Sequence, residues 1–79
     1  MTNKEKYDKA FIESFSISPN DLGNDLEYNS IQTWDSVGHM GLISLLEERF
    51  DIMMEMDDII DFSSYEKGFE LIAKYGIDF

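Results

Sequence analysis

The stretch Trp34-Asp35-Ser36-Val37-Gly38-His39-Met40 lies where a polar loop meets an apolar-striped helix. From Ser36 to Phe50, apolar residues recur every three or four positions, which places them on one face of an α-helix. Asp35 and Ser36 both favour a helix N-cap, so either residue can begin this helix. Its apolar surface is the broadest in the chain, which predicts the central helix of the fold. That surface comprises Val37, Met40, Ile43, Leu46 and Phe50, with Leu42 and Leu45 beside them.

A further long helix is predicted at each end of the chain. At the N-terminus, Thr2 and Glu5 have the spacing of a capping box, and Tyr7, Phe11 and Phe15 then recur every four residues. Toward the C-terminus, we expect first a short helix over 58–61 that is capped by Asp57. The last long helix follows: Ser63 and Glu66 form a second capping box, and Gly76 ends the helix. Its apolar stripe comprises Tyr65, Phe69, Ile72 and Tyr75. With the central helix, this makes three longer helices and one short one.

Residues 18–34 form a long connection between the first two long helices. Pro19 ends the first helix, because proline disfavours a helical residue before it. Asp21 is expected to begin one short helical turn. Connections of this length are uncommon in small domains and are often functional. The apolar residues expected to hold the connection against the helices are Leu22, Leu26, Ile31 and Trp34, the last packing as a hydrophobic staple.

These elements predict an all-α fold, a four-helix bundle formed by the single domain 1–79. Hydrophobic residues make up 43% of the chain, which is too many for a disordered acidic tail. The absence of cysteine excludes disulfides and thiolate metal sites, and no metal site is expected. We expect a cytoplasmic monomer, because the sequence shows no signal peptide, no apolar run of membrane-spanning length and no heptad seam.

The chain is strongly acidic, with a formal net charge of -11. This charge disfavours nucleic acids and anionic membrane surfaces as partners. It favours proteins with basic patches, where opposite charge mainly raises encounter rate and sets orientation. Acids are concentrated near Ser36 and predict a docking face, although each one alone is equally well explained as a solvated charge. With Arg49 as the only base among them, they are Asp35, Glu47, Glu48, Asp51, Glu55, Asp57, Asp58 and Asp61.

The segment Asp35-Ser36-Val37, followed at the matching separation by Leu46-Glu47-Glu48-Arg49-Phe50, resembles the acyl carrier protein family. That family typically has Asp-Ser-Leu at the start of its second helix and a Leu-Glu-Glu-x-Phe ending. The resemblance covers essentially the whole chain and implies an acyl-carrier-like four-helix bundle. It also implies that Ser36 carries 4'-phosphopantetheine, whose thiol holds an acyl or aminoacyl group as a thioester.

The same resemblance implies a partner-facing side on the central helix. The expected partners are a phosphopantetheinyl transferase and the loading and transferring enzymes, each with a basic docking patch. The residues implied to face them are Asp35, Val37, Met40, Glu47 and Glu48. Val37 and Met40 can equally be core residues.

Two glycines, Gly38 and Gly41, lie inside the first turns of the central helix. Each costs about 1 kcal/mol of helix stability relative to alanine. Either the backbone comes close to another group there, or these are neutral surface changes. Carriers of fatty acid synthesis often have acids at these positions, so the departure favours a dedicated biosynthetic pathway.

Catalysis by this chain is not expected. His39 is the only histidine, and neither an orienting acid nor a Gly-x-Ser-x-Gly elbow accompanies Ser36. The Gly38-His39 pair after Asp35-Ser36-Val37 also resembles a subset of carrier proteins, which implies that His39 lies at the surface or near the cargo. The family shelters its acyl chain between the second and third helices. Met53, Met54 and Met56 would either line such a groove or fill the core loosely.

Three functions remain open from the sequence. The first is an acyl carrier modified on Ser36. The second is an aminoacyl or peptidyl carrier that serves an adenylation enzyme and shares the same fold and serine. The third is a non-carrier acidic helical adaptor, in which Ser36 is only an N-cap.

Overall fold

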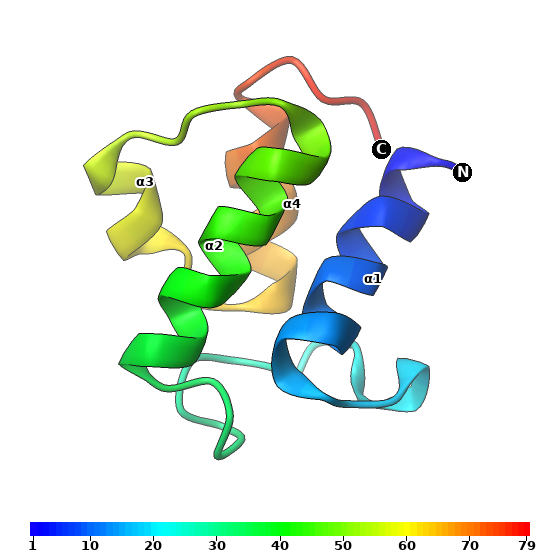
Figure 1. Cartoon of the computed structure of the whole chain (residues 1–79), viewed down its shortest axis with the longest axis vertical. Coiled ribbons are helices and arrows are strands. Elements are labelled where there is room, and N and C mark those ends of the chain that lie inside the picture. Colours follow the sequence, from blue (N-terminus) through cyan, green and yellow to red (C-terminus); the bar gives the residue numbers. More distant parts are fainter.

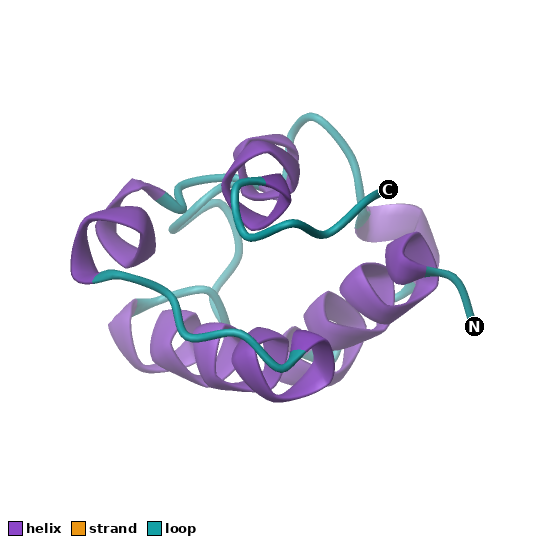
Figure 2. Ribbon diagram, turned by 90° about the horizontal axis from the view of Figure 1, so that it is seen from above, coloured by secondary structure: helices purple, strands orange, loops and turns teal.

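The computed structural model describes residues 1–79 and contains four α-helices and no β-strand, which confirms the predicted all-α class. Figure 1 shows α1 and α2 side by side and running in opposite directions, with α4 behind them and α3 at one edge. Seen from above in Figure 2, α1 and α2 form one layer and α4 lies opposite. The elements are α1 (Asn3–Phe15), a 3-10 turn (Pro19–Asp21), α2 (Ser36–Phe50), α3 (Met56–Asp61) and α4 (Tyr65–Ala73).

The starts of the two longest helices match the prediction. In α1, the Glu5 N–H donates to Thr2 Oγ1 at 3.1 Å and the Thr2 N–H donates to Glu5 Oε1 at 2.9 Å, which is the expected capping box. α2 has the predicted bounds, and its N-cap is Asp35. Ser36 is therefore the first helical residue and is not the cap.

The shorter elements begin at residues other than those predicted. Asp21 ends the 3-10 turn instead of beginning a helical turn, since its carboxylate accepts a hydrogen bond from the Ser18 N–H (3.0 Å). α3 begins two residues early at Met56, so Asp57 lies inside it and its N-cap is Glu55, without a side-chain hydrogen bond. At Asp21 this local hydrogen bond overrides the helix start that propensity suggests.

The cap of α4 is also displaced by one residue. Ser64, and not Ser63, accepts the hydrogen bond from the Lys67 N–H (2.9 Å). The Ser63 carbonyl instead accepts from the Tyr28 N–H (2.9 Å), so this residue joins the long connection to the start of α4. The predicted pairing of Ser63 with Glu66 is therefore wrong.

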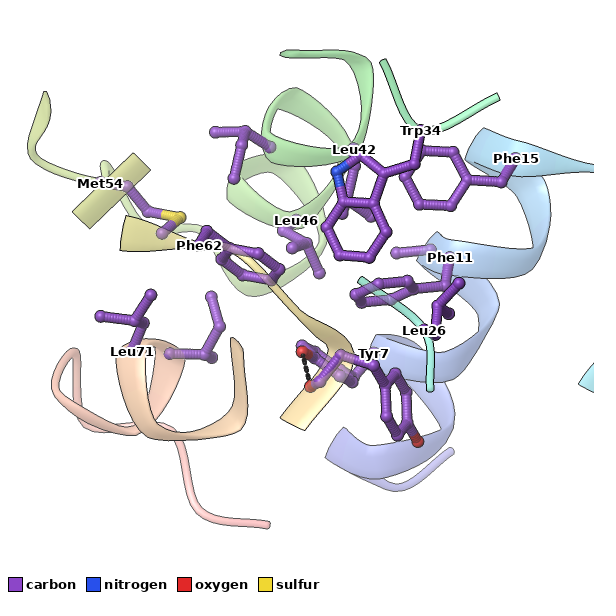
Figure 3. Close-up of a cluster of buried hydrophobic side chains, with 14 of the residues drawn as sticks. Tyr7, Phe11, Phe15, Leu26, Trp34, Leu42, Leu46, Met54, Phe62 and Leu71 are labelled. Carbon is purple, nitrogen blue, oxygen red and sulfur yellow. Dashed lines mark hydrogen bonds between the residues drawn. The ribbon is translucent and has the colours of Figure 1, made fainter. Parts of the chain in front are cut away.

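Aromatic rings from α1 and the long connection form the centre of the core (Figure 3). The predicted α1 stripe of Tyr7, Phe11 and Phe15 is buried. Trp34 is also fully buried, and its ring centroid lies 5.5 Å from Phe11 and 5.1 Å from Phe15. The Tyr7 hydroxyl donates to the Tyr65 carbonyl oxygen at 2.7 Å, which satisfies its one buried polar group.

The face that α2 turns to the core differs from the predicted one at its N-terminal end. Val37 and Met40 point outward, with 82% and 51% of their surfaces exposed. Gly38 turns inward, where an added Cβ would lie 1.9 Å from the Thr33 carbonyl oxygen and 3.3 Å from the Phe15 ring. This close approach of the first turn rotates Val37 and Met40 away from the core. The buried residues of α2 are Leu42, Ile43, Leu46 and Phe50.

The two glycines of α2 should respond oppositely to alanine. Gly41→Ala is expected to raise the free energy of unfolding by about 1 kcal/mol, because its Cβ meets no atom within 4 Å and alanine favours the helix. Gly38→Ala is expected to lower it by about 1–3 kcal/mol through the clash with Thr33. Urea unfolding followed by circular dichroism measures both. Stabilisation by both substitutions would contradict the close contact at Gly38.

Candidate functional site

Ser36 lies on the surface at the first turn of α2, directly after the buried Trp34 and the capping residue. The Asp35 carboxylate accepts a hydrogen bond from the Gly38 N–H (2.8 Å). The first intrahelical bond runs from the His39 N–H to the Asp35 carbonyl (2.8 Å), so the amides of Ser36 and Val37 precede the helical ladder. Since Asp35 already caps the helix, the interpretation of Ser36 as only an N-cap is wrong.

The Ser36 hydroxyl has one hydrogen-bond partner, the hydroxyl of Tyr28, at 3.0 Å. Tyr28 comes from the long connection, and 38% of its surface is exposed. Its ring meets the His39 ring edge-on, with centroids 5.6 Å apart. The sequence analysis missed Tyr28, because a single tyrosine among polar loop residues has no periodicity or motif that indicates a role.

A pocket of about 340 Å³ opens beside Ser36, between α2 and α3. It lies where the acyl groove was expected. Of the three methionines considered for such a groove, only Met56 lines it. Met53 is 85% exposed elsewhere, and Met54 is buried in the core. The pocket is lined by Tyr28, Ser36, His39, Met40, Met56, Ile59, Ile60, Phe62 and Ser63, most of which are hydrophobic.

His39 is half-buried and holds two parts of the fold together. Its Nδ1 accepts a hydrogen bond from the Trp34 Nε1–H at 2.9 Å. Its Nε2 lies 2.8 Å from the Ile59 carbonyl oxygen, which can only accept, so the ring proton is assigned to Nε2. The free lone pair of the ring is thus used by Trp34 and is unavailable to remove a proton from Ser36. Of the two positions expected for His39, at the surface or near the cargo, the structure has it half-buried and lining the pocket.

α3, which forms the outer wall of the pocket, is held mainly by polar contacts. Its only fully buried residue is Asp58, while Met56 and Ile60 are each 70% exposed. The Asp58 carboxylate accepts hydrogen bonds from Lys74 Nζ (2.7 Å) and the Tyr75 hydroxyl (2.5 Å). These two hydrogen bonds, that of Lys74 first, hold the pKa of Asp58 below its usual range. The anionic form of Asp58 therefore holds α3 against the end of α4.

The residues implied to face partners divide into two groups. Val37, Met40 and Glu48 are exposed side chains on the outer part of α2. Asp35 and Glu47 also make hydrogen bonds within the chain, since Glu47 Oε2 accepts from the Met54 N–H at 2.9 Å. Glu47 thus holds the linker between α2 and α3 as well as contributing charge.

An exposed apolar patch surrounds the mouth of the pocket. Met40, Met56 and Ile60 line the pocket and are each more than half exposed. Val37, one helical turn before Met40 on α2, is also exposed. Large exposed apolar side chains gathered around a pocket mark a binding surface more often than scattered single ones do.

The link between His39 and Trp34 can be measured by a double-mutant cycle. His39→Leu is expected to cost about 1–3 kcal/mol of unfolding free energy, because it leaves the buried indole N–H of Trp34 without an acceptor. Trp34→Phe removes that donor. The loss of unfolding free energy in the double variant is expected to be about 1 kcal/mol smaller than the sum of the losses in the two single variants. Urea unfolding measures all three. Additive costs would contradict the hydrogen bond.

The Asp58 contacts predict an acid-sensitive contribution to stability. Because the folded-state pKa is depressed, this contribution is complete above the ordinary aspartate pKa of about 3.9 and is lost as pH falls through the folded-state value. Asp58→Asn should therefore lower the Tm most near neutral pH, and the difference from the parent should shrink below about pH 4. Asp57→Asn, at an exposed position of the same helix, is the matched control. A Tm difference for Asp58→Asn that stays constant across the pH range would overturn this assignment.

No helix of the structure is both long and apolar enough to cross a membrane. No group of three or more histidine, cysteine, aspartate or glutamate side chains is placed to hold a metal ion. Comparison with protein-family models, with curated proteins and with solved structures finds no match for this chain.

Proposed function

We propose that this protein is an acyl carrier protein, modified on Ser36 with 4'-phosphopantetheine. The observation that carries the proposal is the place of the Ser36 hydroxyl, which is exposed at the start of α2 and opens onto an apolar pocket of about 340 Å³. An acyl-carrier-like bundle with a short third helix and a long first connection belongs to the same proposal. The resemblance of the Asp35-Ser36-Val37 segment supplies the identity of the group.

The residues around Ser36 fit a phosphodiester. The amides of Ser36 and Val37 lie ahead of the helical ladder, at the positive end of the α2 dipole, where an anion is stabilised. Tyr28 adds a hydroxyl on the pocket side. When bound, the prosthetic group supplies the thiol on which an acyl or aminoacyl group is held, and this chain has no cysteine to provide one.

The pocket suits an apolar cargo. It lies between Met40 on α2 and Met56, Ile59 and Ile60 on α3, so an acyl chain there would be covered by flexible and branched side chains. Since α3 contributes little apolar burial of its own and is held by polar contacts, it can adjust to different cargoes at small cost.

The proposed partners are a phosphopantetheinyl transferase and the enzymes that load and unload the cargo. The net charge of -11 favours docking surfaces that are basic. Val37 and Met40 add apolar contact area beside Ser36, and Glu48 adds charge on the same helix. We also propose that the protein serves a dedicated biosynthetic pathway with partners of its own. The reason is that Gly38 and Gly41 stand where carriers of fatty acid synthesis often have acids.

We propose no catalytic role for the chain. His39 cannot act as a base toward Ser36, since its lone pair accepts the Trp34 N–H. An aminoacyl or peptidyl carrier would use the same serine and differ only in cargo, so it is a variant of this proposal. The acidic adaptor would give Ser36 no role, since Asp35 caps α2, and the mass measurement below distinguishes it from the carrier.

The direct test is the intact mass of the protein after incubation with coenzyme A and a broad-specificity phosphopantetheinyl transferase. We expect the parent to gain one phosphopantetheine and Ser36→Ala to gain none. Ser44→Ala, which changes another exposed serine of α2, is the matched control and should be modified like the parent. Folded parent protein that gains no mass with several transferases would exclude the carrier function and leave the acidic adaptor.

A further inference from the structure

Tyr28 contacts two other residues that line the pocket, Ser63 and Ser36. Its backbone N–H donates to the Ser63 carbonyl (2.9 Å), and its hydroxyl lies 3.0 Å from Ser36 Oγ. Its ring packs edge-on against His39, at an interplanar angle of 86°. Tyr28 therefore connects the α3–α4 junction, through its backbone, to the first residue of α2, through its hydroxyl. It also lines the pocket beside Ser36.

The backbone on both sides of Tyr28 is fixed by hydrogen bonds. The next residue, Asn29, has a positive φ of 67° and donates its N–H to the Trp34 carbonyl at 2.9 Å. Glu27, on the other side, pairs with Ser64 in an isolated β-bridge. The long connection is thus fixed at the point where it presents Tyr28 to Ser36.

The roles of the two hydroxyls depend on the state of Ser36. In the unmodified chain either hydroxyl can donate to the other. When Oγ forms a bond to phosphorus, the pyrophosphate P–O bond of coenzyme A breaks and adenosine 3',5'-bisphosphate leaves. The O–H bond of Ser36 breaks in the same step and its proton is released, so Oγ can no longer donate. The Tyr28 hydroxyl must then be the donor, either to the ester oxygen or to an anionic phosphate oxygen. A hydrogen bond to an anionic oxygen is stronger than one between neutral hydroxyls.

We infer that Tyr28 is the positioning residue of the modified serine. It holds the phosphodiester on the pocket side of α2 and so directs the arm along the groove between α2 and α3. This inference rests on the proposed function, since it concerns the same Ser36. It assigns the long first connection a role at Ser36 in addition to its packing role in the core.

The test compares the unmodified and modified forms of the parent, Tyr28→Phe and Tyr65→Phe. Tyr65→Phe also removes one tyrosine hydroxyl, but that hydroxyl donates to Asp8 at 2.5 Å and has no contact with Ser36. We expect the change in Tm on modification to be about 2–6 °C more positive in the parent than in Tyr28→Phe. For Tyr65→Phe, the change in Tm on modification should equal that of the parent. A purely structural loss lowers the Tm of the unmodified and the modified form by the same amount.

The ³¹P chemical shift of the modified protein gives a second readout. It should differ between the parent and Tyr28→Phe and stay the same in Tyr65→Phe. Equal changes in Tm and equal ³¹P shifts in all three proteins would overturn the role of Tyr28 while leaving the carrier function intact. A parent that gains no phosphopantetheine would overturn the carrier function itself and this inference with it.

Discussion

The burial of Trp34 is the constraint on which the rest of the structure depends. Its indole packs against the rings of Phe11 and Phe15, with no exposed surface, where an unpaired N–H would be costly. His39 on α2 supplies the acceptor. The end of the long connection and the first turns of α2 are therefore fixed relative to each other. Ser36, between these two residues in sequence, is left on the surface in one defined position.

The same histidine extends this constraint to α3. Its second ring nitrogen reaches the Ile59 carbonyl, while Asp58 contacts the end of α4 through Lys74 and Tyr75. α3 is thus held at both sides by polar groups and buries little apolar surface. A pocket wall held in this way can open without disrupting the aromatic core, because few core contacts are lost when it moves. This combination of a rigid core and an adjustable wall suits a protein that must shelter and release a cargo.

Periodicity in the sequence was sufficient to predict the two longest helices, since the stripes of α1 and α2 and their caps are local signals. The cap of α4 was missed, because a contact from a distant residue occupies the predicted position: the Ser63 carbonyl accepts a hydrogen bond from the Tyr28 N–H. Ser36 was proposed as the attachment site from family resemblance, whereas Tyr28 carries no local signal in the sequence. Inward-facing Gly68 was likewise missed: an added Cβ would lie 2.0 Å from the Tyr7 hydroxyl oxygen, a tertiary contact that helix propensity cannot indicate.

Our central proposal is that the groove beside Ser36 receives an acyl group carried on a phosphopantetheine arm at this serine. It is tested most directly by comparing ¹H–¹⁵N spectra of the unmodified protein with those of the form loaded with a short acyl group on phosphopantetheine. Chemical-shift changes are predicted to concentrate at the residues lining the pocket, above all His39, Ile59 and Ile60. The amides of Lys6 and Ile12, on the far side of α1, should stay unchanged. Changes centred on α1, or none around α3, would contradict the account.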